Sequence, residues 1–207
     1  MCPEHDGAAV PSSDGDRRAV RMSGDGPPAL VTRRLRLAPV AAEDLEELFA
    51  LHADPRAFTE DLTAPLTDPE QMRWVLGRWL ASWAEHGLGY LTVRASGERA
   101  DELPGGLLGV VGLTPLATAG PDVLSAYWRL DPAAAGRGVA GEAMTAVLAD
   151  PALGGRAPEI LAVTAAGNRP SRALAARLGF RPAPPERQVP GGRDGDVLLV
   201  RPGTAIP

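Results

Sequence analysis

The chain has 207 residues, of which 44% are hydrophobic and 23% charged, and its formal net charge is −5. This composition predicts a globular domain with a hydrophobic core, and the acidic balance argues against nucleic acid as a partner, because phosphate binding needs clustered cations. There is no apolar run of about eighteen residues and only one cysteine, Cys2, so neither a membrane-spanning helix nor an intrachain disulfide is expected.

The first segment, residues 1–28, is rich in Gly, Pro, Ser, Asp and Ala and shows no apolar periodicity. Such a composition cannot build a core, so we expect a disordered tail followed by one domain at residues 29–207. The segment also lacks the basic-then-apolar pattern of a signal peptide, which favours a cytoplasmic protein.

A strand and two helices are predicted next. Leu35 and Leu37 alternate with two arginines, the pattern of a half-buried strand, and residues 41–53 place apolar side chains on one helical face. The clearest helix begins at Asp68-Pro69-Glu70-Gln71, which supplies an N-cap, a first-turn proline and a capping-box glutamine, and it ends at Gly87. Its apolar stripe includes Trp79 and Trp83, which either wall a substrate pocket or, as the spacing favours, pack in the core.

The rest of the chain predicts a mixed sheet. Three short apolar runs, at 88–94, 107–113 and 123–130, are separated by turn-rich segments and are typical of neighbouring antiparallel strands. The elements expected after them are a glycine-rich turn at 136–141, a helix at 142–150, a strand at 159–164, a helix at 169–178 and a hairpin at 187–201 around Gly191-Gly192. This order predicts an α+β domain.

The glycine-rich turn is the first candidate site. It reads Gly136-Arg-Gly-Val-Ala-Gly141 and lies between a predicted strand and a predicted helix. Residues without Cβ let backbone amides approach a phosphate, the helix N-terminus adds unpaired donors, and Arg137 adds a cation. The pattern is neither a P-loop nor the dinucleotide-binding fingerprint, and taken alone it also fits a plain tight turn.

A second pattern follows the turn, Asn168-Arg-Pro-Ser171 and then a helix that ends in Leu178-Gly179-Phe180. The two patterns, in this order and spacing, resemble the two signatures of the GNAT superfamily of N-acetyltransferases. The segment Tyr127–Pro132 resembles the branch that includes ribosomal-protein N-terminal acetyltransferases. The resemblance covers about residues 30–201, and it implies an α+β fold whose mostly antiparallel sheet is splayed at its centre with helices on both faces.

The resemblance also implies a binding mode for acetyl-CoA as co-substrate. The CoA diphosphate would bind the amides of Ala135, Gly136, Arg137, Gly138, Val139, Ala140 and Gly141. The pantetheine arm would lie in a slot between strands 123–130 and 159–164, pairing with the backbone near Trp128 and Leu130. Asn168 would hydrogen-bond the pantetheine amides, and Ser171 would lie near the thioester sulfur.

The catalytic residues are less clearly marked. Many family members place a tyrosine seven residues after the asparagine, but this position is Ala175, so Ser171 is the candidate acid, with a helix cap as its alternative role. The acidic base that several relatives carry before the loop is also missing. Glu60, next to Asp61 in the loop after the first helix, is the next candidate, although both could be solvated loop charges.

Two functions follow from these observations. The first is an N-acetyltransferase that acts on a primary amine, either a protein N-terminus or a small molecule, as a monomer or homodimer without nucleic-acid or membrane partners. The alternative is a non-catalytic acyl-CoA-binding module. No metal is expected, because His5, His52 and His86 lack ligand spacing, and we expect His52 and His86 at the surface.

Overall fold

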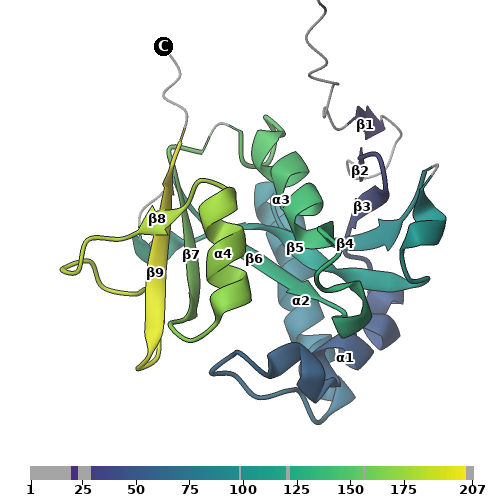
Figure 1. Ribbon diagram of the computed structural model, residues 1–207, viewed down its shortest axis with the longest axis horizontal. Coiled ribbons are helices and arrows are strands. Elements are labelled where there is room, and N and C mark those ends of the chain that lie inside the picture. Colours follow the sequence, from purple (N-terminus) through teal and green to yellow (C-terminus); the bar gives the residue numbers. More distant parts are fainter. Residues whose placement is uncertain (1–19, 23–28, 98, 120–121, 156, 204–207) are drawn as a thin grey trace, which may run out of the picture.

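The computed structural model describes residues 20–22, 29–97, 99–119, 122–155 and 157–203. Its centre is one sheet with the strand order β1-β2-β3-β4-β5-β6-β7-β9-β8 (Figure 1). The strands are β1 (Val20–Met22), β2 (Ala29–Val31), β3 (Leu35–Pro39), β4 (Tyr90–Ala95), β5 (Leu107–Pro115), β6 (Val123–Leu130), β7 (Glu159–Ala165), β8 (Arg181–Pro182) and β9 (Asp196–Pro202). All neighbouring strands are antiparallel except β6 and β7, which are parallel.

The sheet opens at its parallel pair. Strand β6 pairs with β5 along its whole length, from Leu130 opposite Gly109 to Leu124 opposite Pro115. It pairs with β7 only at Val123–Ser125, opposite Glu159–Leu161, and the two strands diverge beyond that point. The predicted splay at the centre of the sheet is therefore confirmed.

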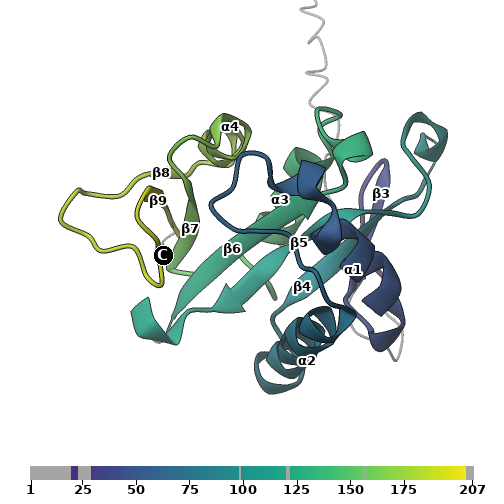
Figure 2. The same ribbon diagram turned by 90° about the horizontal axis from the view of Figure 1, so that it is seen from below.

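Helices cover both faces of the sheet. Figures 1 and 2 show α1 (Leu45–Ala53) and α2 (Pro69–His86) on one face, and α3 (Val139–Ala149) and α4 (Arg169–Arg177) on the other. Leu48, Met72 and Leu76 form a core with Val110 below the sheet, and Met144 belongs to a larger core above it. Short 3-10 helices in the described part of the chain lie at Ala42–Asp44, Pro55–Phe58, Ala100–Glu102, Ala117–Ala119 and Pro132–Ala134.

Most predicted elements are confirmed. The helix predicted after Asp68 is α2, which Asp68 caps through a bond from the Glu70 amide and which ends at Gly87 in the left-handed conformation. Trp79 and Trp83 pack against the core below the sheet, and the Trp83 indole donates to the Tyr90 carbonyl at 2.9 Å. The structure thus favours the core role of both tryptophans over a pocket wall.

Two differences from the prediction concern the glycine-rich turn and the last hairpin. Helix α3 begins at Val139 rather than Glu142, because Gly138 adopts φ 78° and lets the helix start directly after it. The predicted hairpin at 187–201 is wrong in its first strand, since β9 pairs with the two residues of β8 at Arg181–Pro182. The prolines at 182, 184, 185 and 190 lack backbone donors, which explains why the segment before Gly191 forms no longer strand.

Strand β1 lies inside the segment predicted to be a tail and pairs with β2. The remaining residues of 1–28 lie outside the described residues, so the prediction for them stays a prediction.

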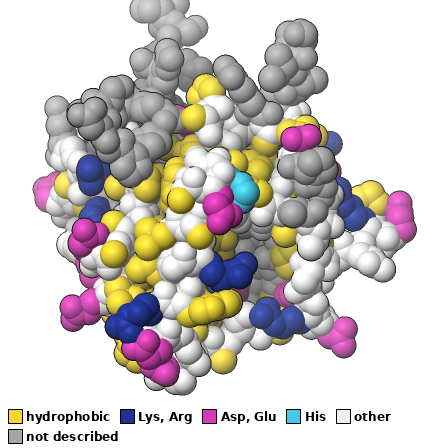
Figure 3. All heavy atoms as spheres, turned by 180° about the vertical axis from the view of Figure 1, so that it is seen from behind, with side chains coloured by type: hydrophobic (Ala, Val, Ile, Leu, Met, Phe, Trp, Pro, Cys, Tyr) yellow, Lys and Arg dark blue, Asp and Glu magenta, His cyan; other side chains and the backbone are white. Residues whose placement is uncertain are grey.

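Within the described part of the chain, no helix is both long enough and apolar enough to cross a bilayer. Figure 3 shows the side opposite to Figure 1, where charged side chains are interspersed with hydrophobic ones.

Candidate active site

A cleft of about 1020 Å³ opens where β6 and β7 diverge. Its walls come from parts of the chain that are far apart in sequence. They include the loop after α1, strand β6 with the turn that follows it, the N-terminal part of α3, the end of β7, helix α4 and the segment that leads into β9. Residues that line it and that the sequence predicted as site residues are Glu60, Trp128, Leu130, Ala135, Gly136, Gly138, Val139, Ala140, Gly141, Asn168 and Ser171.

The N-terminus of α3 faces this cleft without a side-chain cap. Its first intrahelical bond runs from the Glu142 amide to the Gly138 carbonyl at 3.0 Å, so helix geometry leaves the amides of residues 139–141 without a partner inside the helix. The N-cap is Gly138, which has no side chain, whereas α2 and α4 are capped by Asp68 and Asn168. Unpaired amides and the helix dipole together form an environment that suits an anion.

The side chain of Arg137 lies outside the cleft, although the sequence predicts that it contacts a diphosphate. Its guanidinium donates to the Ala133 carbonyl at 3.0 Å and to the Glu102 carbonyl at 3.4 Å. The Arg137 guanidinium is therefore engaged by backbone carbonyls outside the cleft. A different arginine, Arg177 on α4, does line the cleft.

The open edge of β6 presents backbone groups to the cleft. The Val123 carbonyl accepts from Leu116 and the Asp131 amide donates to Leu108, so odd-numbered residues of this segment direct their polar groups away from β7. Strand alternation then directs the amides and carbonyls of Trp128 and Leu130 toward β7. Because β7 has already diverged there, these groups can pair with an extended ligand.

Asn168 is held at both ends of its side chain. Its Oδ1 accepts from the Ser171 amide at 3.0 Å, which caps α4, and its Nδ2 donates to Asp61 Oδ1 at 2.9 Å. The orientation of the amide is therefore fixed, and one Nδ2 hydrogen remains to be directed at a ligand. Figure 2 shows the loop that carries Asp61 extending from α1 toward α4.

Ser171 does not cap α4, because Asn168 does, so the alternative role of this serine as a helix cap is ruled out. The Ser171 hydroxyl oxygen instead accepts from the indole Nε1 of Trp128 at 3.1 Å. That bond occupies a lone pair of the oxygen and leaves the hydroxyl hydrogen available to donate.

A polar network below β6 was not predicted from the sequence. Arg129 donates to Asp61 Oδ2 at 2.7 Å, to the Ala57 carbonyl at 2.6 Å and to the Tyr127 hydroxyl at 2.9 Å. Its guanidinium also lies over the Phe58 ring, 3.7 Å from the centroid. Since the Arg129 side chain is only 10% exposed, this network holds the loop after α1 firmly against β6.

His52 ends the network and is buried, which corrects the expectation of a surface histidine. The last turn of α1 is covered by Trp79, whose ring centroid lies 5.6 Å from that of His52. Nδ1 lies 2.7 Å from the Leu48 carbonyl, which can only accept, so Nδ1 carries the hydrogen. Nε2 is then the acceptor for the Tyr127 hydroxyl at 3.1 Å.

Burial lowers the pKa of His52 from 6.5 to about 4, so the imidazole is neutral in the folded protein at neutral pH. The unfolded chain takes up a proton near pH 6.5 and the folded chain only near pH 4, so the stability that depends on neutral His52 is present above pH 6.5 and is lost as the pH falls. We expect this histidine alone to lower the free energy of unfolding by about 2 kcal/mol between pH 7 and pH 5.

Urea unfolding of wild type and His52→Gln at both pH values measures this contribution. The drop between pH 7 and pH 5 should be about 2 kcal/mol smaller in the variant, because glutamine does not titrate. His86→Gln is the matched control, since His86 is exposed at the end of α2, and it should keep the full drop. Equal drops in wild type and His52→Gln would contradict a buried neutral imidazole.

Glu60 is an exposed residue of the loop after α1 and lines the cleft beside Asp61. Among the described residues, no hydrogen bond or ion pair holds its carboxylate. Asp61 is committed to Arg129 and Asn168, so Glu60 is the acidic side chain of this loop that lines the cleft without such a bond.

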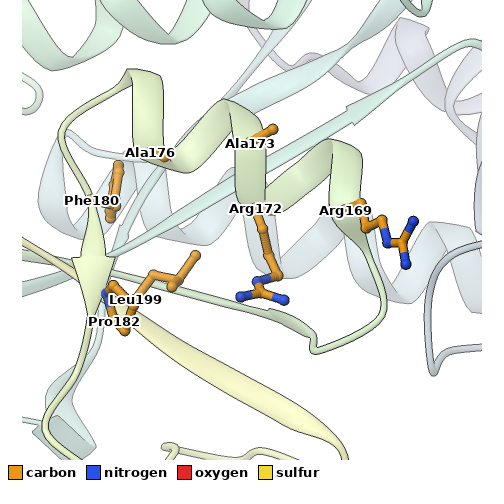
Figure 4. Close-up of a pocket in the computed structure, with 7 residues that line it drawn as sticks. All are labelled: Arg169, Arg172, Ala173, Ala176, Phe180, Pro182 and Leu199. Carbon is orange, nitrogen blue, oxygen red and sulfur yellow. The ribbon is translucent and has the colours of Figure 1, made fainter.

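A second, smaller hollow of about 290 Å³ lies on the side of α4 that faces β8 and β9 (Figure 4). Its lining comprises Arg169, Arg172, Ala173, Ala176, Phe180, Pro182 and Leu199. None of the site residues predicted from the sequence lies there. The larger cleft is therefore the candidate active site.

Comparison with known proteins agrees with this geometry. The family model described as an acetyltransferase (GNAT) domain matches residues 34–181. That match spans β3 to β8 and includes the whole candidate site except the segment leading into β9.

Solved structures resemble the chain over most of its length. An acetyltransferase from Agrobacterium tumefaciens is 26% identical, with a TM-score of 0.67, and the match covers 89% of this chain and 98% of that one. A GNAT-family acetyltransferase from Bordetella pertussis is 30% identical over 84% of this chain and 98% of its own, with a TM-score of 0.65. RimL, a ribosomal L7/L12 α-N-protein acetyltransferase in complex with coenzyme A, is 16% identical over 84% of this chain and 96% of its own, with a TM-score of 0.63, which shows a shared fold.

Proposed function

This chain belongs to the GNAT acetyltransferase family, and from that premise we propose that it transfers an acetyl group from acetyl-CoA to a primary amine. The proposal rests on one observation, that three features line the same cleft. These are the uncapped N-terminus of α3, the unpaired edge of β6 and the Ser171 hydroxyl. The acceptor is a protein N-terminus or a small-molecule amine.

The cofactor half of the cleft would lie between α3 and α4. The amides of residues 135–141 would bind the diphosphate, with residues 139–141 supplying the helix N-terminus. The pantetheine arm would extend along β6 and pair with the backbone of Trp128 and Leu130, while the free Nδ2 hydrogen of Asn168 would contact its amides. This placement supports a thioester near Ser171, one helical turn into α4.

The chemistry requires a neutral amine, a polarised carbonyl and a leaving thiolate that becomes protonated. We assign the uptake of the amine proton to Glu60, directly or through water, because its carboxylate faces the cleft without a partner among the described residues. A backbone amide of β6 would stabilise the negative charge that develops on the carbonyl oxygen. Ser171 would donate a hydrogen bond to the departing sulfur and pass on a proton that its oxygen regains from water, so the thiolate becomes a thiol and the hydroxyl returns to its starting state, while the Trp128 indole holds the oxygen in place.

We expect CoA to raise the melting temperature of the protein. A ligand that binds only the native state, at about 100 times its Kd, adds ~2.7 kcal/mol to the free energy of unfolding. In a domain of this size that corresponds to an increase of about 5–10 °C. Adenosine, which carries no phosphate, is the control ligand. It should leave the melting temperature within about 1 °C of the value for the protein without ligand. A melting curve that saturating CoA does not move would contradict the binding mode.

Turnover is tested separately, by following free thiol release from acetyl-CoA across a panel of primary amines and peptides with free N-termini. Release that depends on the amine supports the transferase. CoA binding without release on any amine would favour the non-catalytic acyl-CoA-binding module, which the replacement of the usual tyrosine by the buried Ala175 makes a concrete alternative.

A further inference from the structure

The first turn of α3 carries a carboxylate close to the proposed phosphate site. Glu142 follows directly after the three amides that we assign to the diphosphate. A negative charge at a helix N-terminus stabilises the helix, but it also repels a phosphate that approaches the same turn. An enzyme that binds a diphosphate here therefore has to neutralise Glu142.

Arg34, which lies 108 positions earlier in the sequence, provides that neutralisation by direct contact. Its Nε donates to Glu142 Oε2 at 2.8 Å and its backbone amide to Oε1 at 3.1 Å, while the Thr32 hydroxyl donates to Oε1 at 2.6 Å. The side chains of Arg34 and Glu142 are 16% and 20% exposed. Burial alone would raise the pKa of Glu142, but the bonds from Thr32 and Arg34 outweigh it and lower this pKa, so the carboxylate stays charged and paired.

The same guanidinium also holds the phosphate loop. Arg34 Nη2 donates to the Arg137 carbonyl at 3.1 Å, between Gly136 at φ 74° and Gly138 at φ 78°. In a trans peptide unit the carbonyl and the amide hydrogen point in opposite directions. Fixing the Arg137 carbonyl toward Arg34 therefore directs the Gly138 amide away from Arg34, and Gly138 lines the cleft.

We propose that Arg34 is a positioning residue for the cofactor diphosphate, which screens the Glu142 carboxylate and directs the Gly138 amide into the cleft. The proposal rests on the proposed function, since it assumes that α3 binds the CoA diphosphate. Arg34 does not line the cleft, so it acts through Glu142 and the loop rather than by contact with the ligand.

Isothermal titration of CoA into four proteins tests the proposal: wild type, Arg34→Gln, Glu142→Gln and the double variant. We expect Arg34→Gln to raise the Kd about 30-fold, because it exposes the phosphates to an unscreened charge and releases the loop. Glu142→Gln should bind at least as tightly as wild type. The double variant should bind several-fold more tightly than Arg34→Gln, since it lacks the unscreened carboxylate.

Two comparisons separate positioning from a general loss of structure. Arg36→Gln removes the same charge from an exposed position in β3, two residues along the chain, and should leave the Kd for CoA unchanged. Pantetheine, which has the thiol arm but no phosphate, should bind Arg34→Gln and wild type equally well.

Three results would overturn the inference. The first is a Kd for CoA in Arg34→Gln within threefold of the wild-type value. The second is a loss of pantetheine affinity in Arg34→Gln as large as its loss of CoA affinity. The third is a double variant that binds CoA no more tightly than Arg34→Gln does. Absence of CoA binding by the wild type would instead refute the proposed function, so the two failures are distinguishable.

Discussion

Gly138→Val is expected to weaken CoA binding by about 100-fold or more. Gly138 is the N-cap of α3 at φ 78°, a conformation that β-branched residues rarely adopt. A Cβ here would also lie 3.4 Å from Arg34 Nη2, so the side chain would disturb the contact that holds the loop. The loss of two bonds to charged phosphate oxygens, each worth ~1.5–3 kcal/mol, accounts for a change of this size. Isothermal titration with CoA measures it.

The matched control is Gly87→Val. Gly87 ends α2 at φ 62°, and a Cβ there would meet nothing within 4 Å, so this variant carries the backbone strain without touching the cleft. Both variants should lose roughly 1–2 kcal/mol of stability, the cost of a left-handed residue with a side chain. Only Gly138→Val should lose CoA affinity. Normal affinity in a folded Gly138→Val protein would mean that the loop is simply a turn.

Ser171→Ala is expected to lower kcat about 100-fold while the KM for acetyl-CoA stays within about threefold. General acid assistance contributes ~10²–10⁴-fold, and a thiolate leaves readily, so the lower end applies. An interaction made only in the transition state lowers kcat and kcat/KM together. The variant also removes the acceptor of the Trp128 indole, for which we expect ~1 kcal/mol of lost stability. Steady-state kinetics with a panel amine and a melting curve measure both effects.

Ser82→Ala is the control for the stability cost. The Ser82 hydroxyl donates to the Leu88 carbonyl at 2.7 Å at the end of α2, remote from the cleft. This variant should lose similar stability with unchanged kcat. A raised KM with normal kcat in Ser171→Ala would assign the hydroxyl to ground-state CoA binding, and unchanged kinetics would remove Ser171 from catalysis.

The parts of the fold that the sequence predicted are those set by local chemistry. Asp68, Pro69 and Gly87 fix both ends of α2 through their own backbone preferences, and alternation at Leu35 and Leu37 identifies β3. The start of α3 was missed because three helical residues, 139–141, continue a glycine-rich run that resembles a loop. The glycine-rich turn at 136–141 was proposed as a phosphate site from its local pattern, whereas the proposed roles of Asn168 and Ser171 came from the family resemblance.

The parts of the site that escaped prediction are contacts between residues distant in sequence. Arg34 and Glu142 are 108 positions apart, and nothing local links them. Strand alternation did place Tyr127 and Arg129 on one face of β6, which could have indicated a polar pair below the sheet. The burial of His52 could not have been read from α1, because it depends on how α2 places Trp79.

The attachment of the loop after α1 separates the positions that must be kept from those that can change. Among the described residues of the loop, Asp61 bonds both Arg129 and Asn168, while Thr59, Leu62 and Thr63 line the same cleft and take no part in those bonds. Under the proposed function, substitutions at these three neighbours would alter the lining that an amine meets without detaching the loop. A combinatorial library randomised at Thr59, Leu62 and Thr63, with Asp61 and Glu60 held constant, would explore new acceptors on an unaltered scaffold.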